Sequence, residues 1–289
     1  MDLTAAYKKD EAKGKDFPMT ARIIALSNQK GGVGKTTTAI NLATALAACG
    51  NRVLVLDFDP QGNTTTGFGI EKRSLTASSY SLLMGESDLA QSTVTTAVPN
   101  LWLVPSTIHL SGAEVELVPV MARENRLKDA LLPAHEVYDY VFIDCPPSLG
   151  LLTINALVAS TDIFIPLQCE FFAMEGLSQL FKTIDLVKRN LNPQLELLGV
   201  LLTMFDKRNN LAQQVVNDVR EHLGEKVFDT IIPRNVRLSE APSHGAPGLI
   251  YDVKSPGSQA YIRLAAELMQ RITVPTLAEQ AAAAVAHAA

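Results

Sequence analysis

One stretch of the chain combines two lysines, two threonines and three glycines at a spacing that suits phosphate binding. Its residues are Lys30, Gly31, Gly32, Val33, Gly34, Lys35, Thr36 and Thr37. Glycines let backbone N–H groups surround an anion, because no Cβ blocks the approach. We expect Lys35 to reach the β- and γ-phosphates of a nucleotide and the Thr36 hydroxyl to bind Mg²⁺. The stretch therefore indicates a nucleotide-binding loop with a magnesium site.

The elements on either side of this loop agree with that interpretation. An apolar run at residues 23–26 predicts a strand before the loop, and residues 39–48 predict a helix after it. The positive end of such a helix would point at the same anion. The pattern departs from the standard phosphate loop, because Gln29 stands where that pattern has glycine. A dinucleotide fingerprint fits less well, since its third glycine would fall at Thr37.

Two carboxylates follow the second apolar run, at residues 53–56. Asp57 and Asp59 stand in the sequence DFDPQGN. We expect them near the phosphate loop, because the ends of successive strands are neighbours in such a sheet. One carboxylate would position the attacking water, and the other would support Mg²⁺ or Lys35. The alternative is a turn that uses Asp and Pro only for their backbone preferences.

A third carboxylate, Asp144, ends the apolar run at residues 141–143 and is followed by Cys-Pro-Pro. This is the form of a Walker B strand, whose terminal Asp binds Mg²⁺ directly or through water. The alternative is an ordinary buried strand with an Asp cap. The two prolines would fix the backbone after Asp144, as a rigid switch segment requires.

Short apolar runs alternate with helical patterns, such as those at residues 176–189 and 211–223. Continuous runs of this kind are typical of strands that are covered on both faces. The predicted fold class is α/β, with a single doubly wound, mostly parallel sheet and helices on both faces. The predicted strands lie at residues 23–26, 53–56, 101–104, 140–143, 163–165 and 198–202, with a weaker seventh at 227–232.

Composition indicates an ordinary globular chain. It has 289 residues, 47% of them hydrophobic, and a net charge of -5, which argues against general coating of nucleic acid but permits a local basic patch. Its three cysteines lack the spacing of a disulfide framework and suggest a reducing cytosol. We expect a polar leader at residues 1–20, one nucleotide-binding domain at 21–272 and an alanine-rich tail at 273–289. No signal peptide or membrane-spanning run is expected.

Taken together, the phosphate loop, the DFDPQGN segment and the Asp144 segment resemble the ParA/MinD family of deviant Walker ATPases. Three further segments resemble its ParA (Soj) branch: residues 168–173 (QCEFFA), 203–206 (TMFD) and 232–243 (IPRNVRLSEAPS). The resemblance covers about residues 22–268. It implies the P-loop fold of the deviant Walker type, with ATP and Mg²⁺ as cofactors.

The resemblance also implies roles for particular residues. ATP binding would form a sandwich homodimer, in which Lys30 reaches across to the partner's nucleotide. Asp59 resembles the aspartate needed for hydrolysis, and Asp144 resembles the magnesium-linked one. Pro233 and Asn235 fall where the family contacts adenine. The dimer would bind double-stranded DNA non-specifically, and a ParB-like centromere-binding protein would stimulate hydrolysis, which separates chromosome or plasmid copies. The implied location is the bacterial cytoplasm, in association with the nucleoid.

Basic residues after the last predicted strands are the candidates for DNA binding. Lysine and arginine side chains in loops can contact phosphates without reading sequence. The alternative is a solvated surface with ordinary ion pairs. Arg208 and Arg237 resemble family positions used for DNA and rank first. No helix-turn-helix is expected before the loop, which makes operator binding doubtful. The full set is Lys207, Arg208, Arg234, Arg237 and Lys254.

Two other classes remain as alternatives. A MinD-like membrane-cycling ATPase would want a basic amphipathic tail, and residues 273–289 contain no lysine or arginine. A nitrogenase-iron-protein-like redox partner would want cysteines that bridge a dimer, and Cys145 and Cys169 lack an evident cluster spacing. A serine hydrolase finds no support, because Pro146 replaces the first glycine of the nucleophile motif.

Overall fold

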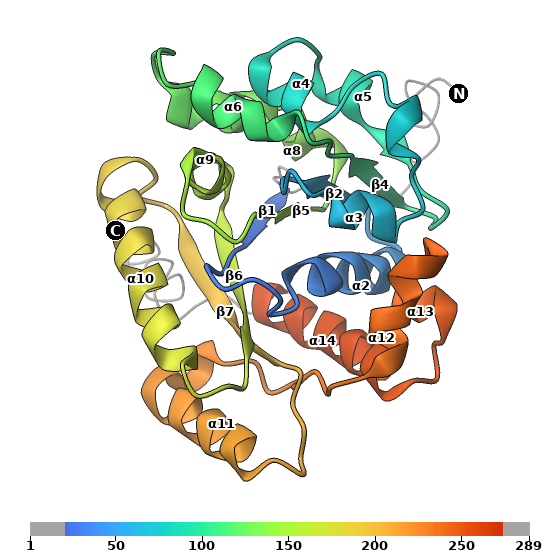
Figure 1. The fold of residues 1–289 in the computed structure, drawn as a ribbon, viewed down its shortest axis with the longest axis vertical. Coiled ribbons are helices and arrows are strands. Elements are labelled where there is room, and N and C mark those ends of the chain that lie inside the picture. Colours follow the sequence, from blue (N-terminus) through green and yellow to red (C-terminus); the bar gives the residue numbers. More distant parts are fainter. Residues whose placement is uncertain (1–20, 274–289) are drawn as a thin grey trace, which may run out of the picture.

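A single sheet forms the centre of the computed structural model, which describes residues 21–273 (Figure 1). Its strand order is β3-β4-β2-β5-β1-β6-β7, and all neighbours run parallel except the antiparallel pair β3–β4 at one edge. The prediction of a mostly parallel α/β sheet is therefore confirmed. The strands are β1 (Arg22–Leu26), β2 (Val53–Asp57), β3 (Val94–Thr95), β4 (Leu101–Val104), β5 (Tyr140–Asp144), β6 (Asp162–Gln168) and β7 (Glu196–Thr203).

The central strands bury side chains on both faces, which explains their continuous apolar sequences. In β1, Ile23 and Ala25 belong to the core on one face, and Ile24 and Leu26 belong to the core on the other. None of these four residues is more than 1% exposed. Polar groups are therefore confined to the ends of the strands, where the loops begin.

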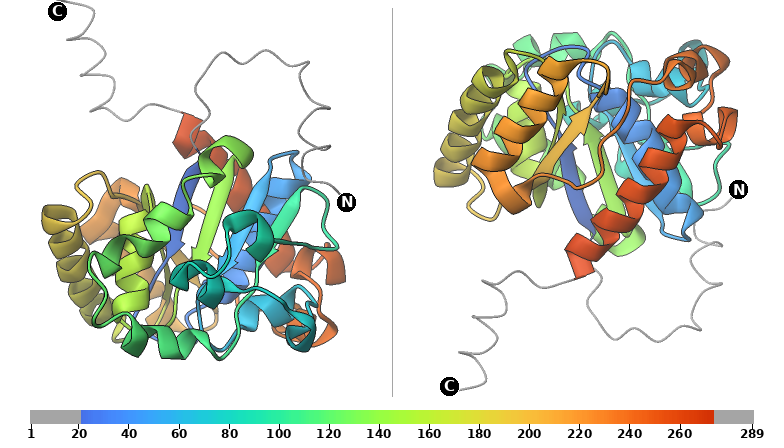
Figure 2. Two further views of the ribbon diagram at one scale, coloured as in Figure 1. Left: turned by 90° about the horizontal axis from the view of Figure 1, so that it is seen from above. Right: turned by 90° about the horizontal axis from the view of Figure 1, so that it is seen from below.

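Helices cover both faces of the sheet, and Figure 2 shows these layers from above and below. Helices α2 and α14 pack together on one face with α12 and α13, whereas α4, α6, α7, α9 and α10 cover the other. Within residues 21–273 no helix could cross a membrane. The longer helices are α2 (Lys35–Ala48), α4 (Ser79–Met84), α6 (Leu110–Glu116), α9 (Leu151–Ala159), α10 (Ala173–Asn190), α11 (Asn210–Leu223) and α14 (Pro256–Thr273). The shorter ones are α3 (Asn63–Gly67), α5 (Leu89–Ser92), α7 (Arg126–Ala130), α8 (Ala134–Val137), α12 (Val236–Glu240), α13 (Gly248–Tyr251) and the 3₁₀ helices η1 (Lys72–Ser74), η2 (Arg123–Asn125), η3 (Gly224–Lys226) and η4 (Ala241–His244).

The weak seventh strand predicted at residues 227–232 is wrong. The segment runs beside β7 but pairs with it only at its two ends: Val227 forms an isolated bridge with Val200, and the N–H groups of Phe228 and Ile232 donate to the Val200 and Leu202 carbonyls at 3.0 and 2.9 Å. In its middle, the N–H groups of Asp229 and Thr230 donate to the Glu267 carboxylate on α14, at 2.7 and 2.9 Å. Because these donors turn towards α14, they cannot form a ladder with β7. The other six predicted strands, and the three predicted helices, are confirmed.

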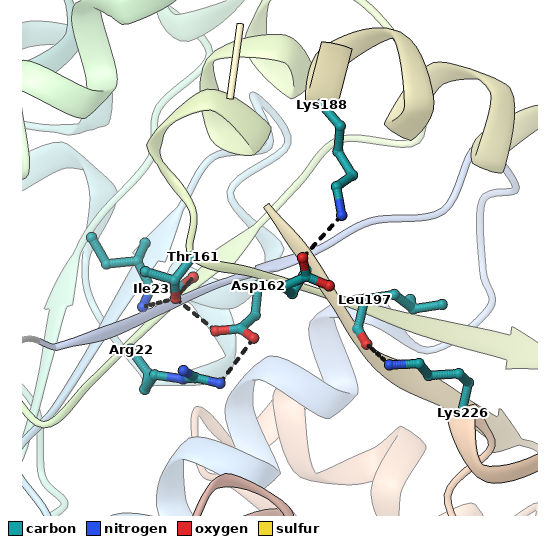
Figure 3. A network of polar contacts seen from close by, with 8 residues as sticks. Arg22, Ile23, Thr161, Asp162, Lys188, Leu197 and Lys226 are labelled. Atoms are coloured by element: carbon teal, nitrogen blue, oxygen red, sulfur yellow. Dashed lines mark hydrogen bonds and ion pairs between the residues drawn. The ribbon is translucent and has the colours of Figure 1, made fainter. Parts of the chain in front are cut away.

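Polar contacts fix the amino ends of β1 and β6 side by side (Figure 3). The Arg22 guanidinium pairs with Asp162 at 3.1 Å. The N–H of Ile23 donates to the Thr161 hydroxyl at 3.1 Å, and that hydroxyl lies 2.6 Å from Asp162. These contacts hold the strands in register at the end of β1 that lies away from the phosphate loop. The predicted leader lies outside the described residues, as does the predicted tail apart from Thr273.

Candidate nucleotide site

The loop between β1 and α2 is attached to two neighbouring strands. The Asn28 amide donates to the Pro166 carbonyl in β6, and the Thr203 hydroxyl at the end of β7 donates to the Val33 carbonyl, both at 2.8 Å. Gly34 precedes α2 with a φ of 92°, a left-handed conformation that costs glycine nothing. The sequence predicted this strand, loop and helix correctly. It did not reveal Asn28 and Thr203 as the side chains that hold the loop.

Lys35 is the first residue of α2, and its ammonium group points back into the loop. Nζ donates to the backbone carbonyls of Asn28 at 3.1 Å and Lys30 at 3.3 Å. Burial lowers the pKa of this lysine, while the nearby Asp144 carboxylate opposes that shift. A buried cation at the N-terminus of a fourteen-residue helix creates a strong positive potential in the loop. An anion such as a phosphate would complement it.

Asp144 lies at the end of β5, next to the loop. Its Oδ2 accepts hydrogen bonds from the hydroxyls of Thr36 and Thr64, each at 2.7 Å. Its Oδ1 is buried and has no hydrogen-bond partner within residues 21–273. Burial raises the pKa of Asp144 to about 6, although both threonine hydroxyls act in the opposite direction. The structure thus brings together Thr36 and Asp144, two of the three residues that the sequence assigns to magnesium, the third being Asp59.

Asp57 and Asp59 reach the site in a different way from the one expected. Strand β5 separates β1 from β2, so the expectation that successive strand ends are neighbours is wrong for this pair. Asp57 instead lies opposite Asp144 in the β2–β5 register. Its Oδ2 accepts from the N–H and hydroxyl of Thr65, at 2.7 and 2.6 Å. Burial, followed by the charge of Asp144, raises the pKa of Asp57 to about 7.

Asp59 stands two residues further on, where the chain leaves the sheet. It is 9% exposed, and its Oδ1 accepts from the N–H of Gln61 at 2.9 Å. Its charge acts on both Lys35 and Asp144, which places all three groups in one electrostatic environment. A carboxylate in this position can orient a water molecule towards a phosphate held by the loop.

These residues fit a magnesium–nucleotide complex. No group of three or more His, Cys, Asp or Glu side chains within residues 21–273 could hold a metal ion. Mg²⁺ in nucleotide sites keeps several waters and takes its remaining oxygens from one or two protein groups and the phosphates. The Thr36 hydroxyl and the unpartnered Oδ1 of Asp144 suit that demand, because one can bind the metal and the other can accept from its water. The buried ammonium group of Lys35 suits the phosphates.

The two buried carboxyl groups predict a pH-dependent stability. The pKa values of Asp57 and Asp144 are raised to about 7 and about 6, so the folded state holds protons that the unfolded state has released. Their stabilising contribution is present below about pH 4 and is lost as the pH rises towards 7. We expect Asp57→Asn to reduce the loss of unfolding free energy between pH 5 and pH 8, measured by urea denaturation without nucleotide. Equal losses in the variant and the parent would contradict the raised pKa.

Pro233 and Asn235, expected to contact adenine, line a pocket beside the loop. Gly34, Thr37 and Met204 line it as well. The Asn235 carboxamide already caps α12, because its Oδ1 accepts from the Leu238 N–H at 3.3 Å. The pocket lies between the end of β7 and the start of α12, next to the loop. It can therefore receive the adenine base of a nucleotide whose phosphates occupy the loop.

Lys30 lies at the mouth of the loop, with 49% of its side chain exposed. It forms an ion pair with Glu170, which follows β6 in the QCEFFA segment. Phe171 and Phe172 next to it are 71% and 66% exposed, and their rings meet edge to face at 5.1 Å. No spacing or motif in the sequence predicts the pairing of Glu170 with Lys30. Within this chain the lysine faces outwards, away from the carbonyls that bind Lys35.

The expected DNA-binding residues form two neighbouring groups. Arg234 lies beside the loop after β7, because its N–H donates to the Phe205 carbonyl at 3.0 Å. The same loop carries Lys207 and Arg208, and Arg208 pairs with Asp206 at 2.7 Å. This ion pair lowers the pKa of Asp206 to about 2.

The second group lies on α12 and after α13. Arg237 pairs with Glu240 at 3.0 Å and Asp252 at 3.5 Å, and its guanidinium lies 6.0 Å from the centre of the Tyr251 ring. The backbone N–H of Lys254 donates to Asp252 at 3.2 Å, which places Lys254 close to Arg237. Arg208, Arg234 and Arg237 are exposed, and ion pairs with acidic neighbours partly balance the charges of Arg208 and Arg237.

Comparison with known proteins gives the family. Residues 21–197 match a family model described as an AAA domain. The chain is 56% identical over 252 residues to the chromosome partitioning protein ParA of Caulobacter vibrioides, covering 86% of this chain and 94% of that protein. It is 55% identical over 247 residues to the sporulation initiation inhibitor protein Soj of Bacillus subtilis, covering 86% and 98%. The chain also resembles a crystal structure of cobyrinic acid a,c-diamide synthase from Mycobacterium smegmatis with a bound ATP analogue and magnesium. The TM-score is 0.77 and the sequence identity is 38%, and the match covers 88% of this chain and 96% of that one.

Both protein relatives share more than half of the aligned residues over nearly their whole length. The fold and the loop geometry agree with a P-loop nucleotide hydrolase. The chain belongs to the ParA/Soj family of chromosome-partitioning ATPases.

Proposed function

We propose that this chain is an ATP-driven switch for DNA partitioning. In its ATP-bound form it is a sandwich homodimer that holds double-stranded DNA without reading sequence. A ParB-like partner stimulates hydrolysis to ADP and phosphate, and the dimer then releases the DNA. The observation that carries the proposal is the presence of two lysines in one loop, of which Lys35 is buried and faces inwards while Lys30 is exposed and faces outwards.

Hydrolysis needs little covalent help from the protein, because phosphoryl transfer is catalysed mainly by positioning and charge. Lys35 and the N-terminus of α2 neutralise the phosphates. Thr36 and Asp144 hold Mg²⁺, which when bound offsets the negative charge that builds up on the phosphoryl oxygens. Asp59 orients the attacking water and supports the metal. Slow ATP hydrolysis at such a site would set how long each dimer stays in its ATP-bound form.

Dimerisation follows from the exposed lysine. Lys30 would exchange its ion pair with Glu170 for the phosphates of a nucleotide on the second copy. An exposed ion pair contributes roughly 0–1 kcal/mol, so this exchange costs little. Hydrolysis removes the γ-phosphate that Lys30 would hold, and the loss of that contact would release the partner.

The two basic groups near α12 are the proposed DNA contacts. Lys207, Arg208 and Arg234 lie around the end of β7, and Arg237 and Lys254 lie beside them. Contacts of this kind bind phosphates rather than base edges, and their strength falls as salt rises.

The test is retention on random-sequence DNA with ATP and with ADP, each at two salt concentrations. Retention only with ATP, and weaker at high salt, is the expected result. Equal retention with both nucleotides would contradict a nucleotide-gated switch. Absent retention with both would overturn the DNA-binding step, and ATP-dependent binding to lipid vesicles would then favour the MinD-like alternative.

Reversing one charge tests the DNA surface. We expect Arg237→Glu to weaken DNA retention, and to lower the slope of log affinity against log salt by at least about 1, because a phosphate contact is lost. ATP affinity should stay unchanged. Arg123→Glu is a matched control, since Arg123 also pairs with an acidic neighbour, Glu124, on η2. Unchanged DNA retention in Arg237→Glu would place the DNA surface elsewhere.

A further inference from the structure

Helix α3 joins two of the carboxylates that form the candidate site. It follows the Asp59 turn directly, and its first turn carries two threonines that bind different carboxylates. Thr64 Oγ1 donates to Asp144 Oδ2 at 2.7 Å, and Thr65 Oγ1 donates to Asp57 Oδ2 at 2.6 Å. All four residues are completely buried. The helix therefore connects the ends of β2 and β5.

The two oxygens of Asp144 are used very differently. Thr36 on α2 and Thr64 on α3 both donate to Oδ2. A carboxylate oxygen offers two acceptor sites, so the two hydroxyls saturate Oδ2. Oδ1 is buried and has no partner in the described part of the chain. The orientation of the unpartnered oxygen is thus set from the opposite side of the carboxylate.

The two hydroxyls differ in what else they do. Thr36 belongs to the phosphate loop motif and is itself an expected magnesium ligand. Its hydroxyl can bind a metal through oxygen while it donates its proton to Asp144. Thr64 lies on a separate element, and its hydroxyl hydrogen bond is to Asp144. A contact from a second element fixes the carboxylate against rotation, which one hydrogen bond alone would permit.

We propose that Thr64 is a positioning residue of the magnesium site, which holds Asp144 so that Oδ1 stays free to accept from a magnesium-bound water. The inference rests on the proposed function, because it deepens the role of the same site. Groups that hydrogen-bond to a metal's carboxylate partners commonly change metal affinity by 10–100-fold when they are removed. Thr64 meets that description, because its hydroxyl donates to Asp144 and it lies on α3, outside the nucleotide loop.

If the role of Thr64 were purely structural, its bond to Asp144 would serve only to give two buried polar groups a hydrogen-bond partner. Thr65 offers the comparison, because it is equally buried on the same helix and also donates to a buried carboxylate. Removing either hydroxyl should lower thermal stability, since an unpaired buried oxygen is costly. Only the loss of the Thr64 hydroxyl should lower the affinity for magnesium.

The experiment measures the affinity of a fluorescent ATP analogue in MgCl₂ and in EDTA. The ratio of the two affinities reports the magnesium contribution without any need for turnover. We expect Thr64→Val to reduce this ratio roughly tenfold. Thr64→Ser should restore it, because serine keeps the hydroxyl. Thr65→Val should lower the melting temperature but keep the ratio of the parent.

Each outcome decides the proposal. A parent ratio near one would overturn the magnesium–nucleotide site itself, and with it the proposed function. A normal parent ratio that Thr64→Val leaves unchanged would overturn only the positioning role. An equal fall in Thr64→Val and Thr65→Val would assign the effect to α3 as a whole and would also contradict it. Thr64→Ala provides the same comparison if the valine variant does not fold.

Discussion

Lys35→Ala is expected to abolish nucleotide binding under conditions in which the parent protein is saturated. The ammonium group is buried, is held by two loop carbonyls and begins a long helix whose positive end faces the same point. A charge-assisted hydrogen bond contributes about 1.5–3 kcal/mol, and this lysine would contact two phosphates. We therefore expect a loss of ATP affinity of roughly 100-fold or more. Titration with a fluorescent ATP analogue measures this loss directly.

A matched variant separates this effect from general damage. Lys188→Ala removes a lysine that pairs with Glu196 at 3.1 Å, in the network around the amino ends of β6 and β7 (Figure 3). It should bind ATP as tightly as the parent. A melting curve without nucleotide establishes that Lys35→Ala is folded. Normal ATP affinity in a folded Lys35→Ala variant would remove Lys35 from its assigned role.

The sequence predicted the elements well, because their signals are local. Six strands are continuous apolar runs that the two cores require, and the phosphate loop carries its own glycines and lysines. The order of strands is not local. The residues around Asp57 contain no signal that β5, more than eighty residues later in the chain, lies between β1 and β2 in the sheet. Asp57 therefore reaches the site through Asp144, and the expected reason for its position was wrong.

Long-range side-chain contacts were equally invisible in the sequence. Glu267 on α14 binds the backbone N–H groups of residues 229–230 and so interrupts the pairing with β7 that was predicted for residues 227–232. Glu170 pairs with Lys30 across 140 positions of sequence, and Thr64 binds Asp144 across 80. No spacing rule connects such residues, because the fold alone brings them together. Motifs identified the groups that we expect to contact the nucleotide, whereas the side chains that hydrogen-bond to those groups could be found only in the structure.

Asp59→Ala should separate binding from hydrolysis. The residue is nearly buried beside Lys35 and Asp144, yet it belongs to neither the phosphate loop nor the base pocket. The variant should bind ATP and form the dimer, because the loop and Lys30 are intact. Its hydrolysis rate should fall by roughly 100-fold, the lower range for loss of a group that assists proton transfer or positions water. Phosphate release under single-turnover conditions measures the rate, and gel filtration with ATP measures the dimer.

The comparison with Asp185→Ala makes this result specific. Asp185 is exposed on α10, and its removal should change neither turnover nor dimerisation. If Asp59→Ala turned over ATP at the parent rate, Asp59 would not belong to the catalytic site. If it failed to bind ATP at all, its main role would be to support the metal, and the attacking water would need another partner. A variant trapped as an ATP-bound dimer should also stay on DNA, because in the proposed mechanism release depends on loss of the γ-phosphate that Lys30 would hold. If the variant stays on DNA longer than the parent protein does, ATP hydrolysis that depends on Asp59 would be linked to the release of DNA from the two basic groups near α12.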